Sequence, residues 1–207
     1  MAKILDITEI KLDWSDLNVR VEHVREQHKR SKGVHVSGVL KYVAQEMKIL
    51  KPRAEDEIDE MPMVVAAGFA MEGLLSGLYP HMMWQPGEVK RQGIVGSPDG
   101  VSMLSITEGR GIADTVIEEF KLTYKSLRTR VGDAILNEWL WMEQMKAYCN
   151  MYVDRPVHAR LHVWFACGDY QYPLKPRYMR YLIEFGRQEL ANNWSLLQKY
   201  KSFAIAE

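Results

Sequence analysis

The stretch ADTVIEEFKLTYKS, residues 113–126, decides the fold of this chain. Its middle, 115–123, is rich in β-branched and aromatic residues, which is typical of a strand. Successive side chains of a strand point to opposite faces, so Glu119 and Lys121 share one face and Glu118 points to the other. A carboxylate and an ammonium group on an apolar strand are costly to bury unless partners or a metal ion use them. This segment therefore predicts both a central strand and the middle of a site.

Periodic segments on both sides of this strand predict an α/β fold with a mixed central β-sheet flanked by helices. We expect helices at 15–50, 63–78 and 135–152, and at the end of the segment 177–203. We expect further strands as two short extended segments within 89–104, at 158–170, and at the start of 177–203. A chain of 207 residues fits one domain. Its expected parts are an N-terminal helical part, a core, and C-terminal strands with a helix, at 1–60, 63–150 and 151–207.

The composition limits the classes of partner and cofactor. Lys and Arg number 27, as do Asp and Glu, so the net charge is zero and any contact with nucleic acid is confined to patches. The two cysteines form no C-x-x-C pair and the histidines form no H-E-x-x-H, which argues against zinc hydrolases. We find no apolar run near the ~18 residues needed to cross a bilayer. The acidic residues near the start argue against a signal peptide, so we expect a cytoplasmic protein without membrane attachment.

Two more acids accompany the strand. Asp99 lies in the turn Ser97-Pro98-Asp99-Gly100, and Glu72 is the single charged residue of the apolar helix expected at 63–78. Glu72 either points to solvent or turns inward, where a carboxylate is expensive without a cation. Mg²⁺ prefers oxygen ligands and is commonly held by one or two carboxylates. With Glu119 and the carbonyl of Phe120, these acids predict a site for a divalent metal ion, and Lys121 supplies a positive charge beside it.

The ordered set of motifs resembles the PD-(D/E)xK nuclease superfamily. A second feature, Gln144 and Tyr148 one helical turn apart, is similar to the Q-x-x-x-Y motif of the RecB-type and phage (lambda-type) exonuclease branch. The resemblance covers roughly residues 63–150. The motifs in this chain are Gly68…Glu72, Pro98-Asp99-Gly100, Glu119-Phe120-Lys121-Leu122-Thr123 and Gln144…Tyr148.

The resemblance implies a restriction-endonuclease-like core and a role for each matching residue. Lys121 is the implied catalytic lysine, and Gln144 and Tyr148 position the site or the DNA strand near it. The implied metal ligands are Glu72, Asp99, Glu119 and the backbone carbonyl of Phe120. The implied ion is Mg²⁺, with Mn²⁺ as the alternative. The iron–sulfur cluster of some relatives needs four cysteines and is excluded here, because this chain has two.

Four other residues are candidates for DNA contact. Thr123 is placed to bond a phosphate, and Lys125 and Arg128 are candidate backbone contacts. For these two cations a solvated basic turn is an equal alternative. His35, which precedes an expected helix, is a further candidate, against the alternative of a structural role.

The resulting hypothesis is a Mg²⁺-dependent DNA nuclease, a phage-type exonuclease acting in recombination, repair or DNA processing. The alternatives are a sequence-nonspecific endonuclease of the same fold and a nucleic-acid-binding protein without activity. A structural protein whose acids are coincidental is a third. The resemblance further suggests a single-strand annealing partner, a homo-oligomer, and the cytoplasm of a bacterial or phage-infected cell.

Overall fold

The computed structural model describes residues 2–10, 31–50, 62–79, 81–104, 114–152 and 154–204. The helical expectation for 15–30 and the turn expected near 105–111 lie outside these residues. No helix in the described ranges is both long and apolar enough to span a membrane.

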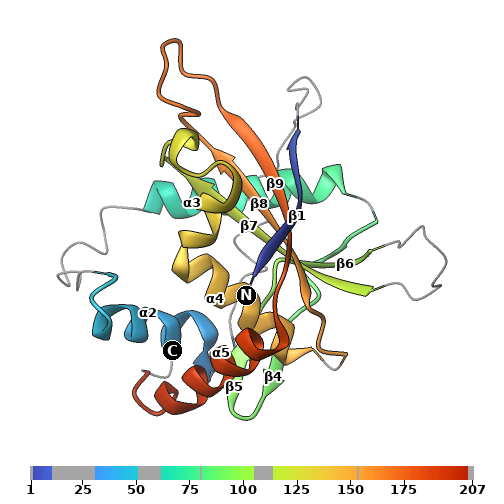
Figure 1. Ribbon diagram of the computed structural model, residues 1–207, viewed down its shortest axis with the longest axis vertical. Coiled ribbons are helices and arrows are strands. Elements are labelled where there is room, and N and C mark those ends of the chain that lie inside the picture. The colour runs from blue at the N-terminus through green and yellow to red at the C-terminus, as the bar shows by residue number, and fades with distance from the viewer. Residues whose placement is uncertain are drawn as a thin grey trace.

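A six-stranded sheet forms the centre of the molecule (Figure 1). Its strands, in spatial order, are β1 (Lys3–Ile10), β9 (Arg177–Glu184), β8 (His158–Phe165), β7 (Asp114–Thr123), β6 (Gly100–Leu104) and β3 (Met83–Trp84). β7 and β8 run parallel, and the other neighbours are antiparallel. The parallel pair requires a crossover, which contains helix α4 (Trp139–Met151). The predicted mixed central sheet flanked by helices is confirmed.

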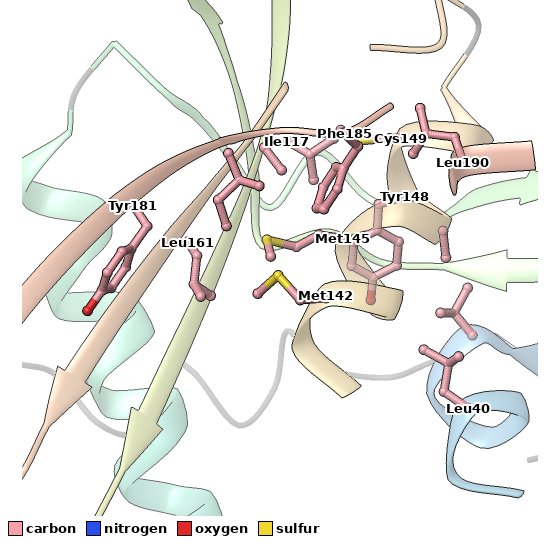
Figure 2. Close-up of a cluster of buried hydrophobic side chains, with 14 of the residues drawn as sticks. Leu40, Ile117, Met142, Met145, Tyr148, Cys149, Leu161, Tyr181, Phe185 and Leu190 are labelled. Atoms are coloured by element: carbon pink, nitrogen blue, oxygen red, sulfur yellow. The ribbon is translucent and has the colours of Figure 1, made fainter. Parts of the chain in front are cut away.

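The two faces of the sheet carry different layers because strand side chains alternate. On β7, β8 and β9 the odd-numbered residues pack against α4, α5 (Arg187–Tyr200) and α2 (Val36–Glu46) in the main core. Figure 2 shows part of this core, where Ile117 and Leu161 of the sheet meet Met142 and Met145 of α4. Even-numbered residues, among them Phe120, form a smaller cluster with Met71 of α3 (Pro62–Leu78). The expected helix at 63–78 is therefore confirmed.

A small second sheet lies beside the first. It contains β2 (Val34–His35), β5 (Ile94–Gly96) and β4 (Val89–Arg91), in that order. The segment 89–104 therefore holds three strands where two extended segments were expected. Gln92 and Gly93 both have positive φ, 47° and 80°, and make a two-residue turn between β4 and β5. Turns of this kind suit the twist of hairpin strands and divide what reads as one extended segment.

The description of 1–60 as a helical part is wrong at its beginning. Residues Lys3–Ile10 are strand β1, which pairs antiparallel with β9 along its length. The isoleucines of this segment favour a strand, and β9 supplies the neighbour that a strand needs. α2 ends at Glu46 rather than continuing to residue 50, and Lys48 adopts a positive φ of 57° just after it. The helix expected at 135–152 begins later, at Trp139, after the short 3₁₀ helices η3 (Leu127–Thr129) and η4 (Gly132–Asn137).

Candidate active site

A pocket of about 340 Å³ opens where β7, α4, α3 and the start of α2 meet. It is lined by residues that are far apart in the sequence, on six different segments. Seven predicted site residues line it: His35, Glu72, Asp99, Glu119, Lys121, Gln144 and Tyr148. The fold therefore brings the catalytic set of the sequence prediction together in one cavity.

A chain of hydrogen bonds joins the strand motif to the helix motif. Lys121 Nζ lies 2.5 Å from Glu119 Oε1 and 3.1 Å from Gln144 Oε1. Gln144 Nε2 in turn donates to the Tyr148 hydroxyl at 2.9 Å, across one turn of α4. E-x-K and Q-x-x-x-Y are thus parts of one bonded unit, with Lys121 in its middle.

Asp99 stands at the point where the ladder between β6 and β7 stops. Gly100 pairs with Glu118, and the next amide of β7 on that edge, from Phe120, donates to Asp99 Oδ2 at 2.7 Å. The N–H and C=O of one strand residue point to the same edge. The carbonyl of Phe120 therefore points to the edge where Asp99 lies, as its predicted role as a ligand requires.

Glu119 is held in an unusual electrostatic state. Its side chain is 1% exposed, and its Oε2 has no hydrogen-bond partner among the residues that the structure describes. Burial, and secondarily the charge of Asp99, raise the pKa of Glu119 from 4.5 to about 8, although Lys121 opposes this shift. For Lys121, burial lowers the pKa, but Glu119 and Asp99 more than compensate and leave it above its usual value. The pocket thus contains more negative charge than its lysine neutralises.

Glu72 reaches this pocket from α3 and is partly buried there. Its charge contributes to the raised pKa of Lys121, so Glu72 is close enough to act on the centre of the pocket. Within the described residues, however, no three Asp, Glu, His or Cys side chains are gathered closely enough to hold a metal ion. Glu72, Asp99 and Glu119 line the same pocket without forming such a cluster.

The donor set nevertheless fits a divalent cation of the Mg²⁺ type. Buried carboxylate oxygens need partners or a metal, and Glu119 Oε2 has neither in the described part of the chain. Mg²⁺ needs only one or two protein carboxylates, since water and substrate oxygens complete its coordination. Asp99 and Glu119 satisfy that requirement, and Glu72 is within the same cavity.

The predicted DNA contacts outside the pocket are engaged elsewhere. Thr123 is buried, and its Oγ1 accepts from the amide of Lys125 at 3.1 Å. Lys125 Nζ lies 2.6 Å from Glu138, and Arg128 Nε lies 4.0 Å from Asp169. Lys125 borders a separate cavity near the start of α4. The roles of these residues in DNA binding stay predictions.

Sequence reasoning missed several residues around the pocket. Glu88 lines it and accepts from the amide of Ser31 at 2.8 Å. Gly96, on β5, lets Tyr148 approach, since a Cβ there would lie 2.9 Å from Tyr148 Cε1 and 2.7 Å from Met151 Sδ. A glycine inside a strand is a signal of such close approach and could have drawn attention to it.

The opposite face of β7 holds a second set of polar residues. Glu118 is directed away from the pocket, as predicted, and its carboxylate bonds Arg160 and His162 of β8. His162 is 1% exposed and hydrogen-bonded. The sequence offers no signal for this role, because the two partners of His162 lie on the neighbouring strands β7 and β9.

No family model matches the sequence, and no curated protein does. Among solved structures, the protein SSO0001 is similar at a TM-score of 0.45 and 14% identity, over 89% of this chain and 82% of that one. A phage related exonuclease from Haemophilus somnus 129PT has a TM-score of 0.43 and 12% identity, over 81% and 80% of the two chains. An alkaline exonuclease (LHK-Exo) from Laribacter hongkongensis has a TM-score of 0.44 and 14% identity, over 83% of this chain and 87% of that one.

Proposed function

We propose that this protein is a Mg²⁺-dependent nuclease that hydrolyses phosphodiester bonds of DNA, with Mn²⁺ as an alternative ion. The observation that carries the proposal is the buried carboxylate of Glu119, whose Oε2 lacks a partner beside Asp99 and Lys121. The order of the motifs, which resembles that of PD-(D/E)xK nucleases, supports the same chemistry. The Q-x-x-x-Y pair favours the exonuclease branch of that superfamily.

The charge of the pocket supports dependence on a metal ion. Four acids line it, Glu72, Glu88, Asp99 and Glu119, against the single lysine Lys121. A phosphodiester is an anion and is repelled by this cavity unless a cation is added. The residues that would hold the ion are Asp99, Glu119, Glu72 and the carbonyl of Phe120. When bound, a divalent ion neutralises charge on the phosphate and lowers the pKa of a coordinated water.

The side chains of this chain have their own tasks around that ion. Glu119 must give up the proton that its raised pKa retains before it can serve as a ligand. Lys121 has three N–H donors, of which Glu119 and Gln144 accept one each. The third is available to orient the attacking water or to bond a phosphate oxygen. Gln144, held by Tyr148, fixes the direction of the ammonium group.

The test is the incubation of end-labelled linear duplex DNA and closed circular DNA with the protein, with and without Mg²⁺ or Mn²⁺. We expect metal-dependent degradation of linear DNA only, and loss of that activity in Lys121→Ala. Lys175→Ala, an exposed lysine outside the pocket, is the matched control and should retain activity. Cleavage of circles would identify an endonuclease instead. No cleavage with either ion would overturn the proposal. An annealing partner and a homo-oligomer stay predictions from the resemblance.

A further inference from the structure

A continuous polar chain crosses the face of the sheet opposite the pocket. It begins at Ser102 on β6, whose hydroxyl bonds Glu118 on β7. Glu118 Oε2 lies 2.7 Å from His162 Nε2 on β8, and His162 Nδ1 bonds the hydroxyl of Tyr178 on β9. That hydroxyl lies 3.0 Å from the hydroxyl of Tyr79, directly after α3. The chain therefore ties four neighbouring strands to the end of one helix.

The burial of this row of polar residues costs free energy, and the chemistry proposed above does not use it. Glu118 and His162 are each 1% exposed, so both were moved out of water on folding. Replacement of such buried charged groups by apolar ones is often neutral or stabilising. Stability alone therefore does not explain why this row of polar residues exists, and the elements that it joins suggest another role.

This row of polar residues touches both elements that carry candidate metal ligands, β7 through Glu118 and the end of α3 through Tyr79. Glu118 is the backbone neighbour of Glu119 on β7. Tyr79 directly follows the last residue of α3, the helix that carries Glu72. The Tyr79 ring is held further by His162, at 5.1 Å between centroids, and by the Arg180 guanidinium, at 5.8 Å. A shift of α3 relative to β7 would break these contacts and move Glu72 in the pocket.

We propose that Tyr79, Tyr178 and His162 are positioning residues that set the carboxylate of Glu72 relative to that of Glu119. This inference rests on the proposed function, because it takes Glu72 as a ligand. The residues touch neither ion nor substrate; they act through the placement of α3. Outer partners of metal ligands affect metal affinity in this way.

The test compares two tyrosines of β9 that each lose a single hydroxyl. Tyr178→Phe removes the link to Tyr79 and His162. Tyr181→Phe is the matched control, since Tyr181 is equally buried and its hydroxyl donates to the carbonyl of Arg130 at 3.2 Å. We expect Tyr178→Phe to weaken Mn²⁺ binding about tenfold and Tyr181→Phe to leave it unchanged. Equal affinities of both variants would overturn the inference.

A double-mutant cycle separates positioning from a general loss of stability. In a Glu72→Gln background, Tyr178→Phe should cause no further loss of Mn²⁺ affinity, because its target is already gone. The same tenfold loss in both backgrounds would contradict the inference.

Hydrogen exchange of the α3 amides, measured without metal, keeps the two proposals distinguishable. Tyr178→Phe should speed this exchange several-fold relative to Tyr181→Phe. Unchanged exchange would overturn the positioning role, whatever the metal affinity. Faster exchange in a protein that binds no Mn²⁺ and cuts no DNA would support the tether of α3 and refute the nuclease.

Discussion

Glu118 and Glu119 are neighbours on β7, and each is 1% exposed, yet their environments have opposite effects. For Glu118 burial raises the pKa, but His162, Arg160 and Ser102 outweigh it and hold the pKa below its usual value. For Glu119 the attraction of Lys121 does not offset the effects of burial and of the Asp99 charge, so the pKa rises to about 8. The difference teaches that partners rather than depth decide the state of a buried carboxylate. The carboxylate of Glu118, which is fully paired, suits a structural role, and the carboxylate of Glu119, whose Oε2 has no partner among the described residues, suits binding.

The largest expected difference between the two faces is in activity. Glu119→Gln should reduce DNA cleavage on the order of 10²–10³-fold, because it removes a charged ligand from the centre of the site. The measurement is the initial rate on linear duplex DNA at saturating Mg²⁺. Glu118→Gln serves as the comparison variant and should retain most activity once its folded fraction is taken into account. A Glu119→Gln protein with the wild-type rate would break the comparison.

In stability the order of the two variants should reverse. Glu118→Gln leaves His162 and Arg160 without their counter-charge and should lower the free energy of unfolding by about 3 kcal/mol. Glu119→Gln should cost less, since Glu119 is already strained by its own burial. Urea unfolding of the metal-free proteins at pH 7 measures both. The comparison fails if Glu119→Gln proves the less stable of the two.

The pH dependence of stability separates the two glutamates further. Between about pH 4.5 and 8 unfolded Glu119 ionises while folded Glu119 keeps its proton, so this residue lowers stability as pH rises. The expected slope from this group is roughly 1 kcal/mol per pH unit. Urea midpoints measured across this window should fall less steeply for Glu119→Gln than for wild type.

Mg²⁺ supplies the control for that measurement. A metal ion binds the ionised carboxylate, so the stabilisation by Mg²⁺ should grow as pH rises through the same window. Parallel slopes for wild type and Glu119→Gln, with or without Mg²⁺, would contradict the assignment of a raised pKa to Glu119.

The smallest expected effect lies beyond the end of β7. Lys125 is ion-paired with Glu138 and does not line the pocket, so Lys125→Ala should weaken DNA binding only a few-fold. If Lys125 contacts a phosphate, the slope of log affinity against log salt should fall by about one. Fluorescence anisotropy with duplex DNA at several salt concentrations measures both quantities. An unchanged slope would remove Lys125 from the DNA-binding surface.

Local periodicity explains which parts were predictable. Period two on β7 separates Glu118 from Glu119, and a spacing of four places Gln144 beside Tyr148, so these orientations follow from the sequence. The apolar surroundings of Glu72 made an inward direction one of two alternatives, and Glu72 lines the pocket. All three inferences need only the geometry of one strand or one helix.

The features that escaped prediction depend on distant partners. β1 is a strand because β9, more than 160 residues later, offers it an edge. His162 becomes a bonded core residue only when Glu118 and Tyr178 flank it. Lys125 forms an ion pair with Glu138, and no local pattern in the sequence predicts that pairing.

The hydrogen bond from the Phe120 amide gives Asp99 a structural role in addition to its proposed role as a metal ligand. This second role affects which site residues would be lost first in evolution. Asp99 accepts a hydrogen bond from β7 directly before β6 begins, so its loss would disturb folding as well as metal binding. The hydrogen bonds of the Lys121 ammonium group in the described residues go to the side chains of Glu119 and Gln144, not to the backbone. In a descendant of this protein that abandoned nuclease activity, we expect Lys121 to drift first and Asp99 to persist. An intact lysine is therefore the better marker of an active enzyme than an intact aspartate.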